Sequence, residues 1–202
     1  MGLISDGTTI FDAGAMSLGG SMVFIKKLTA SSSGTLSFVN GASGVVLDGT
    51  YKEYLFTFKD IHPATDSVNF LVNFSIDGGT NYNVAKTTTF FYAYNNESNG
   101  IESLEYNQGN DLAQGTGFQK IIENVGNDND QCGTGFMNLY DPSSTAFVKH
   151  FTTNMQWYND SEYSQNAYVA GYANTTSAVN AVQFVLESGN IDVGDICLYG
   201  IN

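Results

Sequence analysis

The feature that most constrains the fold is a strict alternation of apolar and polar residues within residues 51–82. Three aromatic side chains share one face of the first run: Tyr54, Phe56 and Phe58. Five apolar side chains share one face of the second: Val68, Phe70, Val72, Phe74 and Ile76. Successive side chains leave a strand on opposite sides, so a period of two indicates strands with one buried face. We therefore expect two half-buried strands joined by a turn at His62-Pro63.

The polar positions of the second run are expected to point away from the core: Asn69, Asn73 and Ser75. Further strand-like runs follow the same logic at residues 21–29, 35–39, 45–47, 84–94, 136–141, 146–157, 167–173, 179–187 and 193–201. Residues 118–125 fit either a strand or a helical turn, and residues 31–34, 95–117 and 158–166 are expected to form turns or loops.

Short strands separated by turn residues about every 8–12 positions are typical of a sandwich or barrel. The sequence therefore predicts an all-β fold, a jelly-roll-like antiparallel β-sandwich. An immunoglobulin-like sandwich remains an alternative, because strand connectivity is not visible in the sequence. The length of 202 residues fits one such domain.

Residues 1–20 differ from the rest of the chain, since apolar residues are scattered there among small ones without a strand or helix period. Such a segment frays unless something holds it. It either docks on a neighbouring protein, adding a strand to that protein's sheet, or packs as an ordinary strand on its own domain. We divide the chain into an extended N-terminal attachment arm, residues 1–20, and a single sandwich domain, residues 21–202.

The charge balance excludes two classes of partner. Seven Lys and Arg residues stand against 20 Asp and Glu residues, a formal charge of −13. Binding to nucleic acid or to anionic lipid depends on basic side chains, so we expect neither partner. Only 13% of residues are charged, about half the usual share, which suits a surface covered by other subunits. Neither a secretory leader nor a membrane-spanning apolar run is recognisable, which predicts a soluble protein made in a cytosol.

The best metal candidate is the segment GNDNDQCG, residues 126–133, in which Asp128 and Asp130 lie two apart. Calcium takes several oxygen ligands from one loop. Position 139, where a calcium-binding helix-loop-helix needs a bidentate carboxylate, holds Leu139 instead. The segment is either a solvated turn, which we favour, or a calcium site.

Other chemistry-bearing residues do not form a recognisable catalytic pattern. Cys132 and Cys197 have no metal-ligand spacing, and free thiols are favoured over one disulfide. His62 and His150 are too few for a zinc site, and the GxSxG nucleophile pattern is absent. The nearest carboxylate pairs, Glu102 with Glu105 and Asp160 with Glu162, lie in polar stretches. We therefore predict no catalytic residue, no cofactor and no metal, and that the chain is not an enzyme.

Five aromatic residues gather around one predicted loop: Trp157, Tyr158, Tyr163, Tyr168 and Tyr172. Aromatic rings on a loop can stack on sugars or anchor an interface. Tyr168 and Tyr172 fit a strand, where core or cross-strand packing is the simpler interpretation. Trp157, Tyr158 and Tyr163 remain open between packing and a carbohydrate-binding platform.

Several stretches together resemble small structural proteins of tailed bacteriophages, particularly those of marine cyanobacteria. They are IHPATDSVNFLVNFSIDGGTNYNVAKTTTF (61–90), YVAGYANTTSAVNAVQFVLESGNI (168–191) and the ending GDICLYGIN. The start MGLISDGTTIFDAG is similar to the short arm of that group. The resemblance spans nearly the whole chain and concerns strand and turn patterns. It implies a virion component with a jelly-roll-type domain and no catalytic residues. Cys197 stands where a polar or β-branched residue is expected.

The leading hypothesis is a structural component of a tailed-phage virion, either a capsid decoration or a tail or fibre protein. It would be anchored to other virion proteins by residues 1–20 and form a homo-oligomer, by preference a trimer, through its sandwich. The alternative is a carbohydrate-binding or receptor-binding module at a fibre tip, and a glycan-degrading enzyme is the third hypothesis.

Overall fold

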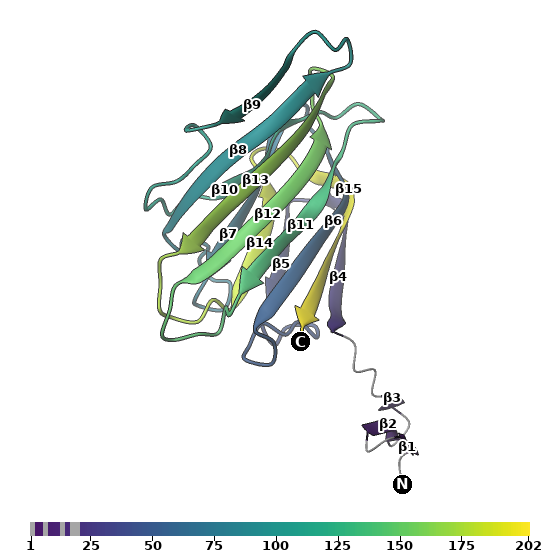
Figure 1. The fold of residues 1–202 in the computed structure, drawn as a ribbon, viewed down its shortest axis with the longest axis vertical. Helices are drawn as coiled ribbons and strands as arrows, with labels where there is room; N and C mark the ends of the chain where they lie inside the picture. The colour runs from purple at the N-terminus through teal and green to yellow at the C-terminus, as the bar shows by residue number, and fades with distance from the viewer. Residues whose placement is uncertain (1–2, 6–7, 13–14, 17–20) are drawn as a thin grey trace.

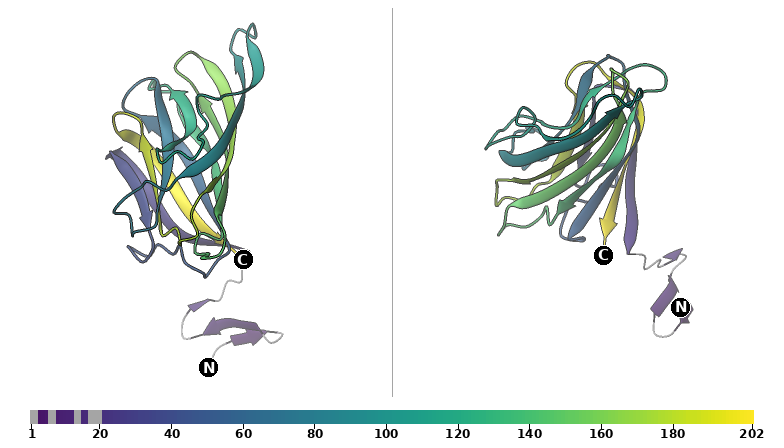
Figure 2. Two further views of the ribbon diagram at one scale, coloured as in Figure 1. Left: turned by 90° about the vertical axis from the view of Figure 1, so that its left-hand side faces the viewer. Right: turned by 45° about the horizontal axis from the view of Figure 1, so that its top comes forward.

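The computed structural model describes residues 3–5, 8–12, 15–16 and 21–202, and within them the fold is all-β (Figure 1). Residues 21–202 form two antiparallel sheets packed as a sandwich. The large sheet has eight strands, in spatial order β4 (Met22–Ser33), β15 (Ile191–Ile201), β6 (Glu53–Pro63), β11 (Gly133–Tyr140), β12 (Lys149–Tyr158), β13 (Tyr163–Ala173), β8 (Lys86–Asn96) and β9 (Glu102–Tyr106). The small sheet has four: β10 (Gln119–Val125), β7 (Val68–Ser75), β14 (Ala181–Leu186) and β5 (Thr35–Val39). Figure 2 shows the two layers from other sides.

The connectivity is that of a jelly roll, which confirms the predicted fold class. Without the strands β8, β9, β12 and β13, eight strands of residues 21–202 remain. The first of these pairs with the last, β4 with β15, and the second with the seventh, β5 with β14. The third and sixth pair likewise, β6 with β11, as do the fourth and fifth, β7 with β10. The chain is thus one long hairpin wrapped into two layers, the arrangement of a jelly roll.

The additional strands β8, β9, β12 and β13 widen the large sheet beyond β11. Strand β12 pairs with β11, β13 with β12, β8 with β13, and β9 with β8. In Figure 1 the large sheet faces the viewer and the small sheet lies behind it. The widening leaves a broad outer face on the large sheet, where the candidate site lies.

The alternation in residues 51–82 correctly predicted which side chains enter the core. Tyr54, Phe56 and Phe58 are buried in β6, and the apolar positions of β7 are buried as well: Val68, Phe70, Val72 and Phe74. They meet Phe184 of β14, which contacts aromatic rings from both sheets. Ile76 is the exception, because β7 ends at Ser75 and Ile76 is 42% exposed.

Two expectations about this region are wrong. The turn was expected at His62-Pro63, but both residues belong to β6, and residues 64–67 instead cross between layers to β7, which lies in the other sheet. Asn69, Asn73 and Ser75 were expected to point into solvent and are buried. Neighbouring segments cover them: Asn73 donates to the backbone oxygens of Tyr82 and Thr116, and Asn69 accepts from the backbone N–H of Asn124.

Several boundaries also differ from the sequence prediction. The expected loop at residues 95–117 contains the edge strand β9, and β13 already starts at Tyr163 within the expected loop 158–166. Strand β4 continues through Ser33 into the expected turn, residues 45–47 form no strand, and residues 118–125 contain the strand β10. These polar segments become strands because a neighbouring strand offers hydrogen-bond partners, which their own composition does not reveal.

Part of the predicted attachment arm, residues 1–20, lies outside the described residues. In the described part of the arm, β2 (Thr8–Asp12) pairs antiparallel with β1 (Leu3–Ser5) and with β3 (Ala15–Met16). Docking on another protein stays a prediction for this segment. In the described residues no helix reaches the length and apolarity needed to cross a membrane.

Candidate interaction face

Two adjacent rows of side chains on the outer face of the large sheet are uncharged except for Lys27, which lies beside Cys197 at the β4 end of the first row. The strand register places one row across the sheet from β9 to β15: Tyr106, Phe91, Tyr168, Asn154, Phe136, Thr57 and Cys197. The adjacent row runs from β8 to β4: Thr89, Ala170, Thr152, Asn138, Leu55, Tyr199 and Phe24. A strand face made for water normally carries Lys, Glu or Asp. These rows are instead suited to contact with another surface.

The β9 edge of this face is the most apolar part of it. We define the β9 patch as Phe91, Leu104, Tyr106 and Tyr168. Leu104 is 72% exposed and Tyr106 is 51% exposed. The rings of Phe91 and Tyr168 stack at 5.3 Å with an interplanar angle of 10°. Cross-strand pairing fixes these rings, so the patch is a preformed surface.

A second apolar patch lies at the opposite edge of the same sheet. We define the β4 patch as Met22, Phe24 and Tyr199. Met22 and Phe24 are both more than half exposed, and the ring of Phe24 packs edge-on against Tyr199 at 5.7 Å. Beyond the patch, Lys27 pairs with Asp195 at 3.3 Å. Exposed apolar side chains clustered on an edge strand mark an interaction site, because an edge strand also offers unpaired backbone groups.

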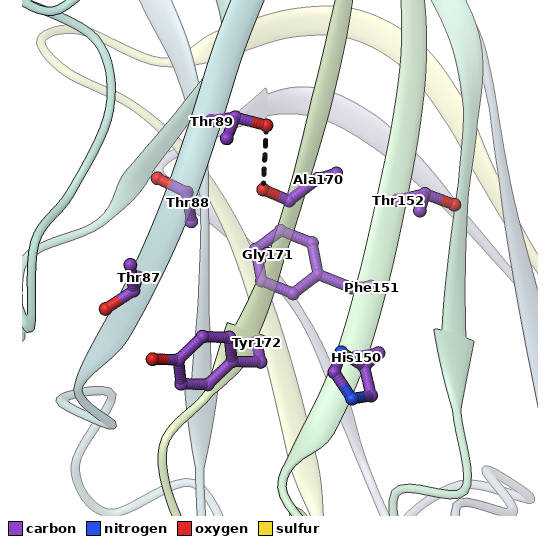
Figure 3. Close-up of a pocket in the computed structure, with 9 residues that line it drawn as sticks. All are labelled: Thr87, Thr88, Thr89, His150, Phe151, Thr152, Ala170, Gly171 and Tyr172. Atoms are coloured by element: carbon purple, nitrogen blue, oxygen red, sulfur yellow. Dashed lines mark hydrogen bonds between the residues drawn. The ribbon is translucent and has the colours of Figure 1, made fainter.

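A depression of about 310 Å³ lies on the outer face between β8, β13 and β12 (Figure 3). Three threonines and two rings surround it: Thr87, Thr89, Thr152, His150 and Tyr172. Ala170 and Gly171 contribute little bulk to its lining. The rings of His150 and Tyr172 meet edge-on at 6.2 Å, and the hydroxyl of Thr89 donates to the backbone oxygen of Ala170 at 3.3 Å. The residues lining this depression include no carboxylate. It offers hydroxyl groups and ring faces, which are groups for binding rather than for bond cleavage.

A second hollow, of about 510 Å³, adjoins the first and shares His150 with it. Its rim carries Phe147, which is 74% exposed, together with Tyr140. A third hollow, of about 550 Å³, lies at the other end of the face beside Tyr158. Amide and hydroxyl side chains surround it: Asn95, Asn96, Asn99, Gln156 and Ser164. The hydroxyl of Tyr158 donates to Glu97 at 3.0 Å, and this hydrogen bond raises the pKa of Tyr158 to about 12.

For Trp157, which the sequence left open between packing and a carbohydrate-binding platform, the structure shows packing. Trp157 is fully buried, because the inward positions of β12 are Phe151, Met155 and Trp157. Tyr158 faces outward beside the third hollow, whereas Tyr163 is half-buried against Tyr94 with ring centroids 5.8 Å apart. Tyr168 and Tyr172 lie in β13, as expected, on the outer face of the sheet. Of the three platform candidates, Tyr158 thus lines the third hollow, and Tyr163 lines a further hollow of about 300 Å³ together with Tyr92 and Tyr94.

The structure does not bring the candidate metal ligands together. In the loop containing Asp128 and Asp130, the backbone N–H of Asp128 donates to the side chain of Gln131, and Gln131 donates back to the oxygen of Asp128. His62 contacts the same backbone oxygen, whereas His150 lies on the outer face. Across the described residues, no three His, Cys, Asp or Glu side chains gather where they could hold a metal ion.

The remaining candidates are separated as well. Cys132 and Cys197 are both free, as favoured from the sequence, and burial raises the pKa of the Cys132 thiol. Glu102 and Glu105 lie three apart in β9, so they leave opposite faces of the strand. Asp160 and Glu162 lie in the turn between β12 and β13. That the chain is not an enzyme stays a prediction.

Comparison with protein-family models, with curated proteins and with solved structures gives no match for this chain. Sequence reasoning missed Phe91, Leu104 and Tyr106 as a group because it placed residues 95–117 in a loop. The signal that could have found Leu104 and Tyr106 is their spacing of two residues, which places both side chains on one face of a strand.

Proposed function

We propose that this chain is a structural subunit that self-associates through the outer face of its large sheet within a larger assembly. The observation that supports this best is the pair of exposed apolar patches at the two edges of the outer face. Burial of apolar surface drives association, and aromatic residues are enriched at the centres of interfaces. The low share of charged residues in the chain fits the same function.

The position of the two patches favours head-to-tail contact. The β9 patch and the β4 patch differ in sequence and lie at opposite edges of one sheet. If the β9 patch of one copy meets the β4 patch of the next, the contact is heterologous, and such contacts close into rings or continue into fibres. A closed trimer is the oligomer we propose.

The resemblance to small structural proteins of tailed phages supplies the kind of assembly. We propose a virion component, either a capsid decoration or a tail or fibre protein, which residues 1–20 would anchor to other virion proteins. Its support is the jelly-roll domain together with the strand and turn patterns of residues 61–90 and 168–191.

The self-association proposal predicts that the double substitution Leu104→Ser and Tyr106→Ser weakens oligomerisation. We expect a dissociation constant at least about tenfold higher, because two exposed anchors lose their apolar surface. Light scattering on a size-exclusion column measures the molar mass over a range of concentrations. Ile76→Ser is the matched control, since Ile76 is also exposed but lies outside both patches. A wild-type protein that is monomeric at every concentration would contradict the proposal.

A second candidate function is supported by the hollow beside Tyr158. One aromatic ring surrounded by amide and hydroxyl groups matches the chemistry that holds a neutral sugar. We propose glycan binding there as the alternative function, for example in attachment to a host surface. Because glycosidic hydrolysis usually needs two carboxylates, and Glu97 is the single one lining this hollow, binding is favoured over cleavage.

The glycan proposal predicts that Tyr158→Ala lowers affinity on a glycan array by about tenfold, through loss of the stacking ring. Tyr172→Ala, at the other end of the same face, is the control and should leave that binding unchanged. Trp157→Ala is not informative, because Trp157 belongs to the core. Equal binding by wild type and Tyr158→Ala would remove the idea.

A further inference from the structure

Two lysines are fully buried in the sandwich, Lys86 in β8 and Lys149 in β12. They lie on either side of Ala173 on the inner face of the large sheet. A buried charged amine without a carboxylate partner is costly, so such a group tends to become neutral. Burial lowers the pKa of Lys86 to about 7, and burial also lowers the pKa of Lys149. Near neutral pH, the Lys86 side chain is thus a neutral amine in a large share of the molecules, and a neutral amine is a nucleophile.

The two lysines differ in what their amines contact. Lys149 donates to the backbone oxygens of Phe147 and Thr175. Lys86 donates to the backbone oxygen of Val84 at 2.7 Å and to the side-chain oxygen of Asn73 at 2.5 Å. A carbonyl bond is about 1.2 Å long, so Nζ of Lys86 lies at most about 3.7 Å from the amide carbon of Asn73. Reacting atoms in a near-attack arrangement are about 3–3.5 Å apart.

The amide of Asn73 is held in one orientation. Its oxygen accepts from the backbone N–H of Phe74 at 2.8 Å, and its nitrogen donates to the backbone oxygens of Tyr82 at 2.6 Å and Thr116 at 3.1 Å. The N–H of Phe74 points at the atom on which negative charge develops when an amine adds to the amide carbon. Asn73 is fully buried, so water does not compete for that carbon.

We propose that Lys86 and Asn73 form an intramolecular isopeptide bond. Nζ of Lys86 adds to the side-chain carbonyl carbon of Asn73, a C–N bond forms, and the bond from that carbon to Nδ2 breaks. A proton passes from Nζ to Nδ2, and Nδ2 leaves as ammonia. The amine and the amide are thereby converted into a secondary amide and ammonia, with no oxidant, reductant or other reactant consumed.

The bond would tie the two layers of the sandwich together. Asn73 belongs to β7 of the small sheet and Lys86 to β8 of the large sheet. Both cysteines are free, so no disulfide links the layers. A covalent link between sheets limits their separation during unfolding, which suits a subunit that carries load in an assembly.

The reaction is expected to be slow and to depend on pH. In the described structure no carboxylate hydrogen-bonds to Lys86 or Asn73, so no acidic side chain can carry the proton from Nζ of Lys86 to Nδ2 of Asn73. The neutral amine is the reactive form, and its fraction rises as pH rises through about 7. The isopeptide bond is therefore expected to form faster at about pH 9 than at about pH 6.

Mass spectrometry tests the proposal directly. The full-length protein, incubated at about pH 9 for several days, should lose the mass of one ammonia. The chain has no arginine, and its lysines around this site are Lys59, Lys86 and Lys120. Trypsin does not cleave after an acylated lysine, so the denatured protein should yield one peptide covering residues 60–120. Peptide 60–86 at full yield, with the unaltered mass of the sequence, overturns the proposal.

Two variants of similar size provide the controls. Lys86→Met removes the nucleophile and should abolish the loss of ammonia. Lys149→Met removes the other buried amine and should leave the loss unchanged. Should either variant fail to fold, the tryptic pattern of the wild-type protein still decides, because it reports on Lys86 by itself. Deamidation of Asn73 is distinguished by a small gain in mass and by normal cleavage after Lys86.

Discussion

Replacing Phe184 with alanine is expected to lower the free energy of unfolding by about 3–5 kcal/mol. The ring is fully buried between the two sheets and contacts four other phenylalanines. Its centroid lies 5.1 Å from Phe58, 5.5 Å from Phe56, 5.9 Å from Phe70 and 6.3 Å from Phe38. Alanine would leave a cavity that neither sheet can close, because both are held by their hydrogen-bonded neighbours.

Urea unfolding followed by tryptophan fluorescence measures this effect, since Trp157 is buried. Phe147→Ala is the matched control. Phe147 is the same residue type but is 74% exposed, so its loss should change stability by no more than about 0.5 kcal/mol. Equal losses for the two variants would mean that Phe184 does not hold the layers together.

Replacing Gly135 with alanine is expected to destabilise the fold by about 3 kcal/mol. Gly135 lies in β11, between β6 and β12, with φ of 150°. An added Cβ would lie 2.2 Å from the backbone oxygen of Asn154 and 2.9 Å from Cα of Met155. Both atoms belong to the backbone of β12, so the clash cannot be relieved by rotating a side chain.

Gly117→Ala is the control for that substitution. A Cβ at Gly117 would meet no atom within 4 Å, and we expect a change within about 0.5 kcal/mol. Thermal unfolding followed by circular dichroism compares the two variants with the wild-type protein. A melting temperature for Gly135→Ala equal to that of Gly117→Ala would show that β12 shifts away at little cost.

The two functional proposals use different parts of the molecule and can be tested separately. Self-association depends on the β9 and β4 patches, whereas glycan binding depends on the hollow beside Tyr158. The proposed isopeptide bond lies in the interior, and its formation depends on neither self-association nor glycan binding. Assignment to a tailed-phage virion stays a prediction, since it depends on a resemblance in strand and turn patterns.

The surroundings of Trp157 and Asn73 could not be predicted from the sequence. The sequence leaves Trp157 open between core packing and an exposed platform, and Trp157 lies at an inward position of β12. Asn73 occupied an outward position of β7 and was expected to meet water. The backbone of residues 82 and 116 covers it instead, and it meets the amine of Lys86. The sequence settled neither position, because the pattern of one strand does not describe the segments that cover it.

By itself the sequence determined the all-β class, most of the strands and the inward apolar side chains of β6 and β7, because alternation is a local property of each segment. Tertiary structure alone decided that β6 and β7 belong to different sheets, that two patches face outward at opposite edges, and that Lys86 lies beside Asn73. These arrangements depend on strand pairings between distant segments, such as β6 with β15 and β7 with β14, and many pairings would bury the same apolar faces. Which pairing forms depends on how all the strands pack at once, and no single segment carries that information.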